Sequence, residues 1–234
     1  MSVGPASFLL PVSKASERLG VHPSRIHHML RDGSLKGAKV GGQWWIDPWS
    51  LERQRVLEAT AGRPYGEANA WALLNLWEAR PVDWVSKWER SRLRRRLRDN
   101  DILDLAPRFR RRAAVQRYRV HPGMLDELAS DPAVVRSGIS AAADYSADIL
   151  GGRELEGYAD GSALRSLEQR YALAKDSSGN VLLHVVEDES RLTRRGNVMS
   201  PVVVALDLME SVDARSRRAG QQLLERLRDD QDPD

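Results

Sequence analysis

Two groups of side chains in this sequence could carry chemistry, and the first is acidic. Glu187-Asp188-Glu189 follows an apolar run that contains His184, and grouped carboxylates of this kind could hold a metal ion for a nuclease. A nuclease of the common core would also need an acid-x-Lys pattern on a nearby strand, but the only lysine within residues 131–228 is Lys175. A histidine inside an apolar strand is more often a hydrogen-bonded core residue than a catalytic one, and the sequence lacks both a Walker-type phosphate loop and a Gly-x-Gly-x-x-Gly motif. We therefore expect no enzymatic activity, no metal ion and no cofactor.

The second group consists of hydrogen-bond donors at helical spacing. After Pro23, the apolar residues Ile26, Met29 and Leu30 recur at the spacing of one helix face. A helix of about nine residues with an apolar back and a basic front is typical of the recognition element of a helix-turn-helix. Neither adjacent histidine has an acidic or cysteine partner at metal-ligand spacing, so we interpret them as donors to DNA. The residues of this helix that we expect to contact DNA are Ser24, Arg25, His27, His28 and Arg31.

Residues that start or end helices and turns lie before and after this helix in the sequence, and they predict the elements that position it. Ser13 is a candidate N-cap for a preceding helix that ends at Gly20, because glycine adopts a left-handed conformation without steric cost. Proline at position 23 suits the first turn of the next helix, and Gly33 ends it. The segments 35–40 and 43–46 are strand candidates joined by a two-glycine turn, which favours a hairpin that we call the wing. Its Lys39 and Gln43 are further candidate DNA contacts, and Asp47-Pro48 starts a third helix.

The order helix, turn, helix, wing, helix resembles the excisionase-like, MerR-type winged helix-turn-helix. This resemblance implies binding to double-stranded DNA. The alternative interpretation is an ordinary three-helix bundle with a hairpin. The residues that carry the resemblance are Ser13 to Leu19, Gly20-Val21, Gly33-Ser34-Leu35, Val40-Gly41-Gly42 and Trp44 to Pro48.

Charge is distributed unevenly along the 234 residues. Residues 1–88 carry 11 Lys and Arg against 8 acidic residues, a net charge of +3, and residues 89–119 carry 12 against 4, a net of +8. Residues 120–234 carry 13 against 21, a net of −8. The excess of positive charge in residues 1–119 indicates a polyanionic partner. The sequence contains no cysteine and no apolar run near the ~20 residues of a membrane span, so we expect a cytoplasmic protein without a membrane partner.

The sequence predicts a second winged-helix-like module over residues 67–121, with two helices followed by a wing. A helix over residues 68–78 precedes a capping box, Ser86 to Glu89, which starts an arginine-rich helix. Two strand candidates follow, Ile102 to Leu105 and Ala113 to Val120, with a basic loop between them. A solvated charged face is the alternative explanation of the helix, but basic clusters on both a helix and a wing tip favour DNA contact. The expected contacts are Arg94, Arg95 and Arg98 on the helix and Arg110, Arg111 and Arg112 on the wing tip.

Residues 131–228 predict a mixed third domain. We expect a weak helix over residues 134–147, a better one from Gly161, strands at 173–175 and 181–186, a helix over 202–209 after Pro201, and a last helix from Asp213. The predicted fold class is α+β, mainly α, with two winged-helix-like modules (12–59 and 67–121) followed by a mixed α/β C-terminal domain (131–228).

Four segments of the second and third modules resemble actinobacterial antitoxins of the AbiEi family, which belong to type IV-like toxin–antitoxin systems. They are 91–98 (Ser-Arg-Leu-Arg-Arg-Arg-Leu-Arg), 179–186 (Gly-Asn-Val-Leu-Leu-His-Val-Val), 203–208 (Val-Val-Ala-Leu-Asp-Leu) and 213–220 (Asp-Ala-Arg-Ser-Arg-Arg-Ala-Gly). The family implies a winged-helix part that binds its own promoter and represses its operon, and a C-terminal part that counters a nucleotidyltransferase-like toxin. The excisionase-like module is an addition to the family's usual single winged helix. The alternative function is an excisionase-like or architectural DNA-bending protein without a toxin partner.

Overall fold

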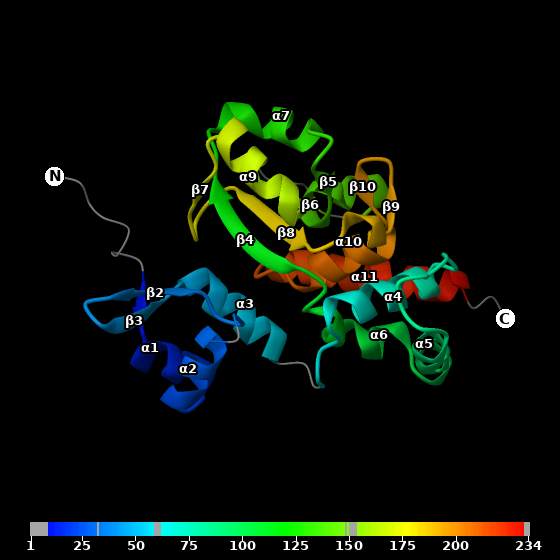
Figure 1. The fold of residues 1–234 in the computed structure, drawn as a ribbon, viewed down its shortest axis with the longest axis horizontal. Helices are drawn as coiled ribbons and strands as arrows, with labels where there is room; N and C mark the ends of the chain where they lie inside the picture. Colours follow the sequence, from blue (N-terminus) through cyan, green and yellow to red (C-terminus); the bar gives the residue numbers. More distant parts are fainter. Residues whose placement is uncertain (1–8, 32, 59–61, 148, 150–153, 232–234) are drawn as a thin grey trace. The chain divides into compact units, whose positions relative to one another are not determined.

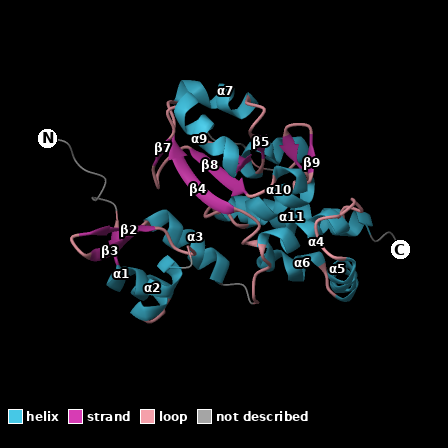
Figure 2. Cartoon of the chain, in the orientation of Figure 1, coloured by secondary structure: helices cyan, strands magenta, loops and turns pink. Residues whose placement is uncertain are grey.

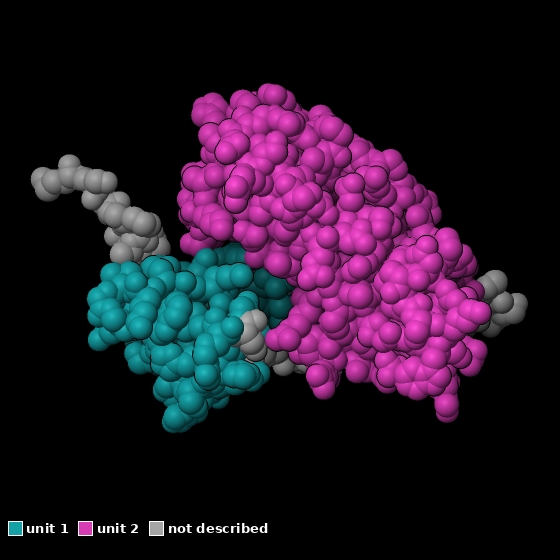
Figure 3. Space-filling view, viewed as in Figure 1, with its two compact units in different colours: residues 1–60 teal, residues 61–234 magenta. Residues whose placement is uncertain are grey.

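The computed structural model describes residues 9–31, 33–58, 62–147, 149 and 154–231. The chain forms two compact units, which we call unit 1 (residues 1–60) and unit 2 (residues 61–234), and each is described by itself (Figure 3). Both combine helices with a sheet (Figure 2), so the expected α+β class is confirmed. None of the described helices is both long and apolar enough to span a lipid bilayer.

Unit 1 has the element order that the sequence predicts, preceded by one short strand. Its sheet has the order β1-β3-β2, and both pairings are antiparallel. The core between the sheet and the helices is formed by six buried residues: Ala15, Ile26, Met29, Leu35, Ile46 and Leu51. The elements are β1 (Leu10–Pro11), α1 (Val12–Leu19), α2 (Pro23–Arg31), β2 (Gly37–Val40), β3 (Gln43–Ile46) and α3 (Pro48–Glu58) (Figure 1).

The turns of unit 1 follow from local chemistry. Gly20 has a φ of 65° and caps α1 through its backbone N–H, whereas Ser13 is not the cap, because the helix begins one residue earlier, at Val12. Gly41 and Gly42 have φ values of 58° and 81°, and a two-residue hairpin turn of type I′ requires a positive φ at both positions. Asp47 accepts hydrogen bonds from the backbone N–H groups of Trp49 (2.8 Å) and Ser50 (3.2 Å), which fixes the start of α3.

Unit 2 is built on one mixed sheet of seven strands with the order β7-β4-β8-β6-β5-β10-β9. The long strands β6 and β8 are parallel neighbours at its centre. The helix α10 is almost completely buried and packs against the longer helix α11 (Figure 1). The strands are β4 (Ala114–Arg119), β5 (Val135–Arg136), β6 (Leu155–Asp160), β7 (Ala174–Lys175), β8 (Val181–Val186), β9 (Arg194–Arg195) and β10 (Val198–Met199). The helices are α4 (Glu67–Trp77), α5 (Lys87–Asp99), α6 (Ile102–Leu105), α7 (Leu125–Ser130), α8 (Gly138–Ala141), α9 (Gly161–Arg170), α10 (Pro201–Met209) and α11 (Ala214–Gln231), with short 3-10 turns between some of them.

The second wing predicted within residues 67–121 does not form. Its first strand, residues 102–105, is the helix α6, because the Asp101 carboxylate caps the N–H of Leu103 at 2.8 Å while Ile102 and Leu105 are buried. Its second strand, β4, pairs with β8 and β7 in the large sheet. Residues 67–121 therefore have no sheet of their own, and they belong to the same compact unit as residues 131–228.

Residues 131–228 keep several predicted elements but change their connections. The helix from Gly161 and the helix after Pro201 are confirmed. Before this segment, Ser86 caps α5 as predicted, but the Glu89 carboxylate accepts hydrogen bonds from Asn69 and Arg92, so only half of the expected capping box is observed among the described residues. The expected helix over residues 134–147 is replaced by β5, α8 and a 3-10 turn. The strands β7 and β8 do not pair with each other, because β4 lies between them. The central strand β6 was not predicted at all.

Gly179 provides a test of how closely β4 approaches the turn before β8. A Cβ atom at this position would lie 1.9 Å from the carbonyl oxygen of Tyr118, in the backbone of β4. We expect Gly179→Ala to lower the free energy of unfolding by about 1–3 kcal/mol, the usual cost of overpacking, as measured by urea denaturation. Gly161→Ala is the control, because its added Cβ would have its nearest contact at 3.5 Å. Equal stability of the two variants would contradict this packing.

Candidate nucleic-acid interface and buried polar cluster

The helix α2 has the two faces that the sequence predicts. Ile26 and Met29 are completely buried and form its back. The five candidate DNA contacts of the helix, from Ser24 to Arg31, are all exposed. The helix contains no acidic residue, so nothing within it opposes the approach of a phosphate backbone.

Local contacts hold the ends of this face. The ring nitrogen Nδ1 of His22 lies 2.8 Å from the Ser24 hydroxyl and accepts a hydrogen bond from the Ser24 backbone N–H at 3.3 Å. At the other end, Arg31 donates from Nε to the carbonyl oxygen of His27 at 3.4 Å. Arg25 forms no ion pair with any described residue, so its guanidinium group is available to a ligand.

The wing of unit 1 presents its candidates at the hairpin turn. Lys39 and Gln43 are exposed on β2 and β3, next to the Gly41-Gly42 turn, and Val40 between them is half exposed. Trp44 packs instead against the core of unit 1. The hairpin therefore has a polar, basic tip on an apolar base.

The arginines expected on a second wing tip have other roles. Arg112 is 1% exposed and forms ion pairs with Asp207 and Glu210. Its Nε atom donates to the Tyr158 hydroxyl at 2.8 Å. Arg110 donates to the backbone carbonyls of Pro107 (2.9 Å) and Gly62 (3.2 Å). The prediction that Arg112 contacts DNA is therefore wrong, since its guanidinium group lies in the core; Arg111 is exposed.

The arginines of α5 face solvent as expected. Arg94, Arg95 and Arg98 are exposed, and Arg95 forms an ion pair with Asp99 at 3.4 Å. Because no wing follows α5, the winged-helix argument for DNA binding by this helix no longer applies.

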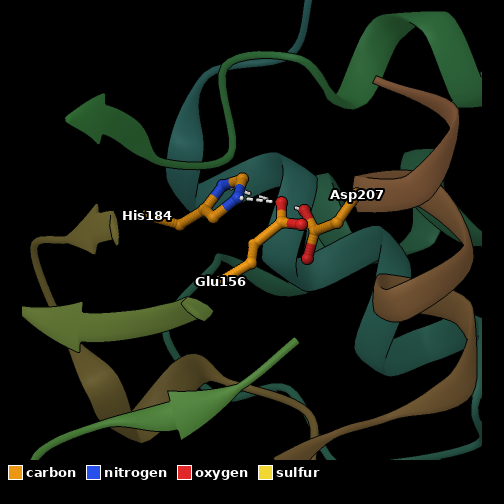
Figure 4. A group of neighbouring side chains, drawn as sticks. All are labelled: Glu156, His184 and Asp207. Atoms are coloured by element: carbon orange, nitrogen blue, oxygen red, sulfur yellow. Dashed lines mark hydrogen bonds and ion pairs between the residues drawn. The ribbon is translucent and has the colours of Figure 1, made fainter. Parts of the chain in front are cut away.

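A buried polar cluster lies between the sheet and α10 of unit 2 (Figure 4). Glu156 comes from β6, His184 from β8 and Asp207 from α10, and one possible ligand atom from each lies within 4.8 Å of the others. His184 Nε2 lies 2.9 Å from Glu156 Oε1, and His184 Nδ1 lies 3.7 Å from Asp207 Oδ1. The imidazole ring also stacks on Tyr158, with a centroid distance of 4.7 Å.

Fixed protein donors already satisfy the carboxylates of this cluster. Asp207 accepts hydrogen bonds from Arg112, from the Ser137 hydroxyl and, at 2.9 Å, from the Tyr158 hydroxyl. Glu156 accepts from the backbone N–H of Ile139 at 3.1 Å. A metal ion here would have to displace the guanidinium group from Asp207, and such buried, fully bonded networks usually specify a core. We therefore assign the cluster to the stability of unit 2.

The sequence singled out only one residue of this cluster. His184 is a buried, hydrogen-bonded histidine, as predicted. The acidic run that follows it does not join the cluster: Asp188 caps a 3-10 turn through Ser190, and the N–H of Glu187 donates to Glu67. One signal in the sequence could have indicated Asp207, because it is a single acid within the apolar run 202–209.

Comparison with known proteins adds no independent assignment. No family model, curated protein or solved structure matches this chain.

The electrostatics of buried carboxylates predict acid sensitivity. Burial alone would raise the pKa of Asp207, but the His184 ring and the Arg112 guanidinium group outweigh it and hold that pKa below its usual value. Burial would also raise the pKa of Asp131, but hydrogen bonds from the Ala133 N–H and the Tyr171 hydroxyl, together with the charge of Arg170, outweigh this effect and lower that pKa.

These lowered pKa values set the sign of the pH dependence. A carboxyl group whose pKa is lower in the folded state than in the unfolded chain, where it is about 3.9, stabilises the fold above that value. The stabilisation is lost as the pH falls through the folded-state pKa. We expect the urea midpoint of the protein to fall as the pH drops below about 4. Burial raises the pKa values of Glu67 and Glu78, and these groups act in the opposite direction at higher pH. A midpoint that rises as the pH drops below about 4 would contradict the assignments of Asp207 and Asp131.

Proposed function

We propose that the protein binds double-stranded DNA through unit 1, with α2 in the major groove and the wing against the neighbouring backbone. The observation that carries this proposal is the exposed polar face of α2 on its buried apolar back. The major groove of B-DNA admits an α-helix, and arginine recognises guanine there through two hydrogen bonds. Arg25 is the best placed for this role, because it is exposed and has no ion-pair partner in the described part of the chain.

The wing supports α2 in this arrangement. Lys39 offers a cation to a phosphate group, and the Gln43 amide offers a donor to phosphate or sugar. The chain turns at two glycines, which have no side chains to hold the hairpin away from the DNA backbone. Contacts of this kind fix the position of a protein on the duplex, whereas contacts from α2 would read the sequence.

We further propose that the protein is a repressor and antitoxin, acting in the cytoplasm on its own operon and on a cognate nucleotidyltransferase-like toxin. The support for this part is the resemblance to AbiEi-family antitoxins. Its four segments fall on α5, β8, α10 and the start of α11, which all belong to unit 2. Unit 2 as a whole carries 28 Lys and Arg against 28 acidic residues, so its net charge does not steer it. The acidic excess lies within residues 120–234, and it would complement locally the positive cleft that we expect in a toxin that handles nucleotides.

A gel-shift measurement tests DNA binding, and co-expression tests the antitoxin part. The full chain should retard a duplex taken from upstream of its own coding region more strongly than a shuffled duplex of equal length. It should also restore growth to cells that express a neighbouring nucleotidyltransferase gene. Equal retardation of both duplexes would contradict sequence-specific binding. The architectural alternative would be favoured if the protein binds the specific duplex but does not rescue growth, and if the gene next to its own encodes an integrase.

A further inference from the structure

Trp88 is the most exposed large apolar side chain in the described part of the protein. Its relative exposure is 72%, compared with 49% for Val40 and 45% for Val212. Trp71, by contrast, is fully buried, and the Trp84 indole donates to the carbonyl oxygen of Ala68 at 3.1 Å. Packing in unit 2 therefore explains the neighbouring tryptophans but does not explain Trp88.

The surroundings of Trp88 are strongly basic. The guanidinium carbon of Arg92 lies 5.1 Å from the centroid of the indole ring, within the range of a cation–π contact. Lys87, Arg94 and Arg98 are exposed along the same helix, and none of them has an ion-pair partner among the described residues. We call Lys87, Trp88, Arg92, Arg94 and Arg98 the α5 platform.

The helix that carries this platform is held firmly from behind. Leu93 is buried against the core of unit 2. The guanidinium group of Arg90 donates to the carbonyl oxygen of Val82, and Ser86 caps the helix by accepting from the N–H of Glu89 at 3.1 Å. The platform is therefore a fixed surface at the edge of unit 2, as Figure 1 shows for α5.

We propose that the α5 platform binds single-stranded RNA, with an unpaired base stacked on Trp88 and phosphate groups on Lys87, Arg94 and Arg98. An exposed aromatic ring among cations is the arrangement by which proteins bind single strands, since every base has a π-face to stack. A base inside a duplex is covered by its neighbours on both faces, so a duplex would lack the stacking contact with Trp88 and keep only the phosphate contacts. Unpaired, splayed bases are a regular feature of folded RNA. This proposal does not depend on DNA binding by unit 1.

The test measures binding of the full-length protein to a fluorescein-labelled 12-nucleotide oligouridine by fluorescence anisotropy. Trp88→Ala should weaken binding by about 5- to 150-fold, the usual effect of losing one stacked base, and Trp88→Phe should restore part of the affinity. The double variant Arg94→Ala/Arg98→Ala should reduce the slope of log affinity against log salt by about 1.4, or ~0.7 for each phosphate contact.

Matched controls separate this surface from general charge and from misfolding. Arg165→Ala/Arg218→Ala removes two exposed arginines from α9 and α11, and Val212→Ala removes another exposed apolar group; both should bind RNA as the unaltered protein does. All variants should keep its circular dichroism spectrum. Unchanged affinity in Trp88→Ala would overturn the proposal. So would equal binding of double-stranded RNA, tighter binding of the matching single-stranded DNA, or competition by polyglutamate as effective as competition by unlabelled RNA.

Discussion

Replacing Arg112 with methionine is expected to lower the free energy of unfolding of unit 2 by about 3–5 kcal/mol, the cost of breaking a buried ion pair by removing one partner. The variant leaves the Asp207 carboxylate buried without its guanidinium partner and removes one ion pair from Glu210. It also removes the donor to the Tyr158 hydroxyl. Methionine has a similar length, so the loss reflects charge and hydrogen bonding more than volume. Urea denaturation of the full chain, followed by hydrogen exchange at β8, measures the effect.

The adjacent arginine provides the control. Arg111 is exposed, and Arg111→Met should leave the urea midpoint nearly unchanged, as most surface substitutions do. Both residues were expected at a wing tip, where each substitution would weaken DNA binding and spare stability. A stable Arg112→Met protein with weakened DNA binding would support that earlier expectation and contradict the buried position.

The sequence could not separate Arg112 from its neighbours because charge patterns carry no information about tertiary partners. Residues 110–112 are three consecutive arginines, and the third forms ion pairs with a carboxylate from α10 and one from the residue after it. Those carboxylates lie almost 100 positions further along the chain. Buried pairs between such distant residues are set by the fold, and no local periodicity reveals them.

Local sequence patterns also could not predict how the strands of unit 2 pair. Residues 114–119 were correctly predicted as a strand, but their partners are β8 and β7, which follow much later in the chain. The segment 102–105 is apolar and short, and such segments do not distinguish a strand from a helical turn by periodicity. The Asp101 cap decided this in favour of a helix.

Unit 1 was predicted far better because its signals are local. Glycines with positive φ, a proline at the first position of α2 and an aspartate cap of α3 each determine the conformation of their own neighbourhood. The exposed candidate residues of α2 follow from the same helical period. DNA binding by this surface remains a prediction.

The double variant Arg25→Ala/Arg31→Ala is expected to weaken binding to the specific duplex by about 2–6 kcal/mol, because each guanine contact by arginine contributes ~1–3 kcal/mol of discrimination. Binding to random DNA should weaken much less, because phosphate contacts from the wing remain. Both side chains are exposed on α2, so the fold should be unaffected. Titration of both duplexes in gel shifts, at one fixed salt concentration, gives the two affinities.

The matched control changes two exposed cations of unit 1 outside α2. Lys14 and Arg18 lie on α1, where each pairs with a glutamate. Lys14→Ala/Arg18→Ala should therefore reduce both affinities slightly and equally. An equal loss on specific and random DNA in the α2 variant would make Arg25 and Arg31 phosphate contacts without a role in reading the sequence.

Selection of bound duplexes from a randomised DNA library by the full-length protein tests the central claim most directly. If α2 reads the major groove, repeated selection should enrich a short motif that contains guanine, and the Arg25→Ala/Arg31→Ala variant should fail to enrich it. Enrichment of the same motif by the variant, or of no motif by the unaltered protein, would contradict the account.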